Sequence, residues 1–175
     1  MPKISNLKLA QSEVSQTIDL KKVLGIDLTD YPEVKKAIGQ AIIDLMVART
    51  EDGLDVNGKK FASYSKDYKE SLPFKAFGKT AKVNLTQAGD MLSLIDILDD
   101  SGNKLKIGWA DETENAKAYN HNTGDTVPKR QFFGITDEDL RKITDEFKPD
   151  LKKSQSDTAI LNKLNKIADY IIEDV

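Results

Sequence analysis

Several residue types are absent or scarce, and each shortage excludes a class of chemistry. The 175 residues include no cysteine, which excludes disulfides, thiolate metal sites and cysteine nucleophiles. His121 is the only histidine, so a zinc site with two histidine ligands is excluded. Only Arg49, Arg130 and Arg141 are arginines, a poor inventory for bidentate recognition of phosphates or guanine edges. Sequence-specific DNA binding is therefore not expected.

Long apolar runs are also missing. The longest uninterrupted apolar runs span only a few residues, which is too short for a membrane helix. The start of the sequence, Met1 to Asn6, lacks the apolar stretch of a signal peptide. We therefore expect no membrane partner, no export by that route, and synthesis in the cytoplasm.

The residues that are present suit a folded, mildly acidic protein. Hydrophobic residues make up 39% and charged residues 31%, enough apolar material for a packed interior. The 26 basic and 29 acidic side chains give a formal charge of -3, and the length suits one core. We divide the chain into an N-terminal arm at 1–28, where polar and apolar residues alternate only weakly, a core at 29–150 and a C-terminal helix at 151–175.

The most regular pattern predicts a long helix that ends near Gly53. Pro32 suits its first turn, and Thr29 or Asp30 is expected near its start. Apolar residues recur every three or four positions from Val34 onward, so one stripe of the helix faces a core. This helix is expected to be central to the fold.

Shorter patterns predict a small antiparallel sheet and further helices. Asn57-Gly58 is a tight-turn pair, because both residues tolerate positive φ. A helical turn at 89–94 leads into a strand, and the turn at 99–103 leads into a second strand that alternates with period two. The remaining expected elements are a short helix at 112–120, a polar loop at 120–125, a strand at 130–134, a helix capped by Thr136 and ended by Pro149, and an amphipathic helix from about Ser156.

Charge is segregated along the chain. Residues 57–82 carry seven lysines against two acids, with Tyr64, Tyr68, Phe74 and Phe77 between the lysines. Residues 96–114 carry six acids against two lysines. The two regions either meet in a repeated head-to-tail contact, the kind that closes rings, or lie side by side within one subunit.

No complete catalytic or cofactor motif is present. Gly78-Lys79-Thr80 matches the end of a phosphate-binding loop, but Pro73 stands where its first glycine belongs. Residues 99–103 copy the start of a calcium loop that lacks its glycine and its closing glutamate. No serine lies in a nucleophile-elbow pattern that would use His121. We expect no catalytic residue, no cofactor and no bound metal, and therefore not an enzyme.

Three stretches occur in a distinctive order: 57–65 (NGKKFASYS), 83–92 (VNLTQAGDML) and 128–139 (PKRQFFGITDED), the last preceded by HNTG at 121–124. Together they resemble the virion-morphogenesis proteins of tailed phages, the tail-completion, tail-terminator and neck group. The resemblance covers about residues 34–147. The motif residues expected to maintain the fold or to contact neighbouring subunits are Asn57, Gly58, Tyr64, Asn84, Thr86, Gly89, Met91, His121, Gly124, Pro128, Arg130, Phe132 and Gly134.

The resemblance implies a structural virion protein without catalysis. Its implied fold is a small α+β domain with helices against an antiparallel sheet, assembled as a ring, six-fold by expectation, where the phage tail meets the head. The implied partners are further copies of the chain, head-tail connector or portal-side neck proteins, the tail tube protein, and genomic DNA that passes through the lumen without sequence-specific binding. Arg130 is expected to bind a carboxylate bidentately within or between subunits, and Phe132 to anchor a strand in the core.

Two alternatives remain open. The first is a phage-encoded nucleic-acid-binding protein that uses the lysine and aromatic segment 57–82 to track single strands. The second is an enzyme with acidic metal ligands at Asp96, Asp99 and Asp100. In either case the two end segments, 1–28 and the helix after Ser156, are expected to become ordered only with partners.

Overall fold

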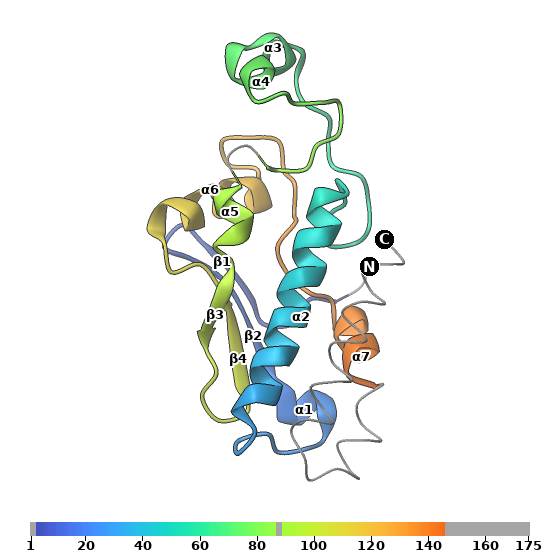
Figure 1. Ribbon diagram of the computed structural model, residues 1–175, viewed down its shortest axis with the longest axis vertical. Helices are drawn as coiled ribbons and strands as arrows, with labels where there is room; N and C mark the ends of the chain where they lie inside the picture. Colours follow the sequence, from blue (N-terminus) through green and yellow to red (C-terminus); the bar gives the residue numbers. More distant parts are fainter. Residues whose placement is uncertain (1–2, 87–88, 146–175) are drawn as a thin grey trace.

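One antiparallel sheet and the helices around it give the chain the α+β fold that the sequence predicts. The computed structural model describes residues 3–86 and 89–145 (Figure 1). Within these residues the sheet has the strand order β1 (Leu7–Ala10), β2 (Glu13–Asp19), β4 (Lys104–Gly108) and β3 (Asp96–Asp99). The helices are α1 (Leu20–Leu24), α2 (Pro32–Glu51), α3 (Lys66–Glu70), α4 (Leu72–Ala76), α5 (Asp90–Ser93), α6 (Glu112–Thr123) and α7 (Asp137–Asp145).

The long helix α2 lies along the sheet and forms the core with it (Figure 1). It begins at Pro32 and ends at Glu51, and Gly53 turns the chain away with a φ of 79°, as predicted. Thr29 and Asp30 lie just before its start, as expected, and Tyr31 occupies the N-cap position without a side-chain capping hydrogen bond. Gly39 permits a close approach to the sheet, since a β-carbon there would lie 2.5 Å from Cδ1 of Ile97.

The prediction of a peripheral N-terminal arm is wrong. Residues 7–19 form β1 and β2, and β2 pairs with both β1 and β4 in the interior of the sheet. Val14, Leu20 and Leu28 from this region are buried in the core. The alternation is weak because Gln16 interrupts the apolar face that Val14 and Ile18 form, while Glu13, Ser15, Thr17 and Asp19 make up the polar face.

The strand predicted at 130–134 is also absent: the segment is extended and belongs to no strand of the sheet. Residues 132–136 are nevertheless fully buried, so their peptide groups need partners other than a neighbouring strand. The partners are side chains. Arg49 Nη2 donates to the carbonyls of Phe132 and Gly134 at 2.8 Å each, and Asn122 Oδ1 accepts from the Phe133 amide.

Gln16 completes this set of contacts from the sheet. Its Oε1 accepts from the Ile135 amide at 2.7 Å, and its Nε2 donates to the Ile135 carbonyl and to the Ser5 carbonyl, both at 3.0 Å. The primary amide thus replaces a partner strand for residue 135. The burial of three polar side chains, Gln16, Arg49 and Asn122, follows from the same need.

The other short elements mostly follow the sequence. The tight turn at Asn57-Gly58, the helical turn α5, the β3–β4 hairpin and α7 are present, and Thr136 caps α7 by exchanging hydrogen bonds with Asp139. The expected polar loop at 120–125 is corrected, because α6 continues to Thr123 and ends at Gly124, whose φ is 80°. The predicted helix from about Ser156, Pro149 as a helix stop and the whole C-terminal segment 151–175 lie outside the described residues. Among the helices of the described part, none combines the length and the apolar character needed to cross a membrane.

Replacing Gln16 by Met tests whether the buried amide holds the 130–136 segment. The change keeps the side-chain length but leaves the amide and carbonyl of Ile135 unpaired, so the free energy of unfolding should fall by about 2–4 kcal/mol. Chemical denaturation followed by circular dichroism measures the loss.

Gln40→Met is the matched control for this prediction. Gln40 is exposed on α2 and its side chain donates to Asp44, so its replacement should change the free energy of unfolding by less than about 0.5 kcal/mol. Equal losses in the two variants would contradict the role assigned to Gln16.

Candidate functional site

A helical excursion, residues 62–82, projects from the end of the molecule (Figure 1). It consists mainly of α3 and α4, whose N-termini are capped by the side chains of Ser65 and Ser71. Both of its ends lie at Gly53: the Phe61 amide bonds the Gly53 carbonyl at 2.8 Å, and a β-carbon on Gly53 would lie 2.9 Å from the Val83 carbonyl oxygen. The excursion is therefore a loop inserted at the end of α2.

The aromatic residues of the excursion pack mainly on one another. The rings of Tyr64, Tyr68 and Phe74 lie 5.1 to 5.6 Å apart between centroids, two of the three pairs edge to face. These rings stabilise the two short helices, which are too short to be stable alone. Leu72 and Phe77 stay outside this cluster and are exposed.

A pocket of about 360 Å³ lies where the excursion joins the body. The excursion contributes Tyr64, Tyr68 and Lys79, and the body contributes His121 from α6 and the loop that ends at Arg130. The lining residues are Tyr64, Ser65, Tyr68, Lys79, Leu85, His121, Thr126, Val127, Pro128 and Arg130. No acidic side chain is among them, so the pocket can attract anionic groups.

Arg130 is the main positive group of this pocket. Its side chain is buried, its Nε donates to the Ala62 carbonyl at 3.2 Å, and its guanidinium lies 5.4 Å from the centroid of the Tyr64 ring. Within the described residues it forms no ion pair with a carboxylate. Burial lowers the pKa of Arg130 and, in the same way, the pKa of Lys79.

His121 lies beside Arg130 and is neutral at pH 7. Burial and the charge of Arg130 lower the pKa of His121 to about 4. Its Nδ1 is buried and has no hydrogen-bond partner among residues 3–86 and 89–145, while its carbonyl accepts from the Arg130 amide at 2.7 Å. The expected loop histidine is thus a helix residue whose backbone positions Arg130, and it lacks the partners of a general base in the described part of the chain.

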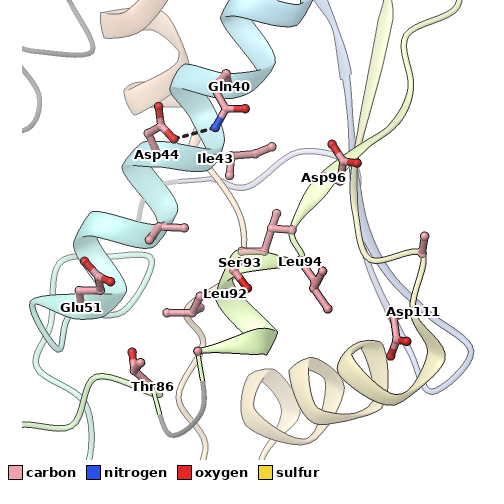
Figure 2. A pocket seen from close by; sticks show the side chains of 14 residues that line it. Gln40, Ile43, Asp44, Glu51, Thr86, Leu92, Ser93, Leu94, Asp96 and Asp111 are labelled. Carbon is pink, nitrogen blue, oxygen red and sulfur yellow. Dashed lines mark hydrogen bonds between the residues drawn. The ribbon is translucent and has the colours of Figure 1, made fainter.

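A second hollow, the acidic groove, lies between α2, α5 and the start of α6 (Figure 2). Its volume is about 850 Å³. Asp44 and Glu51 come from α2, while Asp96 and Asp111 lie on the opposite side, with Leu94 between the two pairs (Figure 2). No lysine, arginine or histidine is among the described residues that line it, so its field is negative.

The thirteen motif residues occupy several places. Tyr64, His121, Pro128 and Arg130 line the Arg130 pocket, and Asn84 accepts there from Lys79 Nζ at 3.2 Å. Thr86 and Gly89 line the acidic groove instead. The others maintain local structure: Met91 accepts from the Trp109 indole, Gly124 ends α6, Phe132 and Gly134 belong to the buried segment, and Asn57 and Gly58 form the tight turn.

Sequence reasoning missed two of the groove acids and the role of Lys79. Asp44 and Glu51 stand seven residues apart on α2, a spacing that puts them on one face of a helix and that predicts a shared surface. The sequence places Lys79 in an incomplete phosphate loop and in the basic segment 57–82, whereas its side chain lines a pocket beside Tyr64 and Tyr68. Local spacing in the sequence does not indicate which distant residues lie beside Asp44, Glu51 or Lys79 in the folded chain.

The acids of the β3–β4 hairpin serve local turns. Asp99 accepts from the Ser101 amide at 2.9 Å and from its hydroxyl, and Asp96 accepts from the Ile97 amide. Across residues 3–86 and 89–145, no group of three or more histidine, aspartate or glutamate side chains is placed to hold a metal ion. Asp96, Asp99 and Asp100 are accordingly not gathered into one site.

In comparisons with protein-family models, curated proteins and solved structures, the chain matches none. A proposal about function therefore depends on the surfaces of the described residues. They consist of a positive pocket, an acidic groove and an exposed basic excursion.

The lowered pKa of His121 makes stability depend on pH in a predictable direction. In the folded state His121 stays neutral down to about pH 4, whereas in the unfolded chain it is protonated near pH 6.5. The free energy of unfolding therefore falls as the pH drops between these values. Between pH 7.5 and 5 this group alone should lower the free energy of unfolding by about 2 kcal/mol.

The measurement is urea unfolding at both pH values, with His121→Gln as control. The variant should lose about 2 kcal/mol of the pH dependence that the native chain has, because no imidazole remains to titrate. Since the sequence has one histidine, its ring proton resonances also report the folded pKa without ambiguity. A resonance that titrates near pH 6.5 would contradict the buried, neutral assignment.

Proposed function

We propose that the chain is a structural virion protein: a ring-forming subunit of a phage neck that completes or terminates the tail and joins it to the head. Its partners in this proposal are further copies of itself, head-tail connector or portal-side neck proteins, and the tail tube protein. Genomic DNA passes through the lumen without sequence-specific binding, which the net charge of -3 favours because phosphate affinity comes from lysine and arginine.

The observation that carries the proposal is the packing of the first and third sequence motifs on one another. The Val56 amide, beside the turn of the first motif, bonds the Gln131 carbonyl of the third at 2.8 Å. Arg130 of the third motif donates to Ala62 and stacks on Tyr64 of the first. Asn84 of the second motif binds Lys79 at the same pocket. Motifs that resemble those of one family thus form a connected structural unit in an α+β domain, the fold that the resemblance implies.

The surfaces of the chain also favour assembly over catalysis. A basic excursion and an acidic groove occupy different parts of the same molecule. Complementary patches at different places on one subunit produce head-to-tail contacts, and such contacts close into a ring when the rotation between neighbours allows it.

Binding to single-stranded nucleic acid by segment 57–82 is the second candidate, with weaker support. Lys66, Lys69 and Lys75 are exposed and suit a phosphate backbone. Stacking on bases, however, needs free aromatic faces, and Tyr64, Tyr68 and Phe74 already pack against one another. Only Phe77 among the four aromatics is exposed.

The oligomeric state and the particle content test the proposal together. Light scattering after size-exclusion chromatography should give a mass several times that of the 19.5-kDa chain, six times for a six-fold ring. Antibody labelling of virions should place the protein between head and tail.

Binding of single-stranded DNA separates the two candidates. The ring proposal expects none at 150 mM salt, whereas salt-dependent binding that Lys59→Glu with Lys60→Glu abolishes would support the second candidate. A chain that is always monomeric and absent from particles would contradict the first.

A further inference from the structure

The exposed apolar side chains of the molecule are divided between two places. In the described residues only three large hydrophobic side chains are exposed: Leu72 (78%) and Phe77 (53%) on the excursion, and Leu94 (47%) in the acidic groove. Leu72 belongs to α4 and Phe77 follows its last residue. Exposed apolar groups gathered in this way mark surfaces that a partner covers.

Charge divides between the same two places. Lys69 and Lys75 stand three residues on either side of Leu72, and neither forms an ion pair within the described part of the chain. The groove offers Asp44, Glu51, Asp96 and Asp111 with no described cation among its lining. The groove thus combines apolar side chains with negative charge, and the excursion combines them with an excess of lysines over its two acids, Asp67 and Glu70.

The sizes of the two surfaces also correspond. A five-residue helix is about 7.5 Å long and about 10 Å wide with its side chains, which gives a volume of roughly 600 Å³. The groove holds about 850 Å³. The volume of a single short helix such as α4, with part of the turn after it, is therefore no larger than that of the groove.

We propose that the excursion of one subunit docks into the acidic groove of a second copy of the chain, with Leu72 and Phe77 against Leu94 and with the lysines beside the carboxylates. The inference rests on the proposed ring and specifies its contact. The occupant is a second copy because the excursion does not fill the groove of its own subunit: Leu72 remains 78% exposed, and Tyr64 anchors the excursion on Arg130. The contact is head to tail, since each subunit offers one element and receives the other.

Charge reversal with mixing of variants tests this contact. The excursion variant is Lys69→Glu with Lys75→Glu, and the groove variant is Asp44→Lys with Glu51→Lys. All four side chains lie on helix surfaces, without a cap or core role. Each variant alone should associate roughly tenfold or more weakly than the native chain, because like charges then face each other in every contact.

Mixing distinguishes this contact from a general effect of charge. In an equimolar mixture, the reversed excursion meets the reversed groove and the native excursion meets the native groove, so assembly should return. The variant with all four changes should also assemble alone. Light scattering measures both results, and circular dichroism checks that each variant is folded.

Two further pairs control for net charge. Lys104→Glu with Lys129→Glu changes the charge as much as the excursion variant, and Asp30→Lys with Asp125→Lys as much as the groove variant, at exposed residues that line neither surface. Both should assemble like the native chain. Loss of assembly in these pairs would overturn the inference.

These assembly measurements distinguish a wrong docking contact from a wrong proposed function. If the native chain assembles and the excursion and groove variants assemble equally well, the contact is wrong while the ring stands. If the two variants lose assembly but their mixture does not regain it, the contact is also wrong. If the native chain stays monomeric and is absent from virions, both proposals fail.

Discussion

The fold depends on an extended segment that crosses the core without a partner strand. Residues 132–136 are buried, and their backbone is hydrogen bonded by side chains from β2, α2 and α6 instead of by a sheet. Unpaired peptide groups in such a place are costly, which explains why Gln16, Arg49 and Asn122 are buried in otherwise apolar surroundings. The same segment begins next to Arg130 and ends at α7, so the hydrogen bonds to it connect the core to the pocket that Arg130 lines.

The sequence predicts elements whose signals are local. The period of α2, the turn pair Asn57-Gly58, the β3–β4 hairpin and the Thr136 cap each depend on neighbouring residues, and the structure contains all of them. Two errors, the N-terminal arm and the strand at 130–134, concern long-range pairing. Extended residues at 130–134 look like a strand whether or not a partner lies beside them, and the short alternation of β2, interrupted by Gln16, does not reveal its partners β1 and β4.

The candidate surfaces were only partly predictable for the same reason. Composition identifies the basic stretch 57–82, but it does not indicate that Tyr64, Tyr68 and Phe74 pack together while Leu72 stays exposed. The acidic count at 96–114 identifies part of the groove, yet Asp44 and Glu51 come from a helix that starts more than sixty residues before Asp96. Segregated charge in a sequence therefore indicates that contacts exist, and tertiary structure determines which residues share them.

The convergence of both ends of the excursion at Gly53 has an evolutionary consequence. Because Phe61 and Val83 leave and rejoin the body at one point, the intervening residues can lengthen, shorten or change composition at small cost in loop-closure entropy. The body then acts as a constant frame that carries an exchangeable element. Related chains can then differ in that element and in their binding partners, while the interior of the body stays the same.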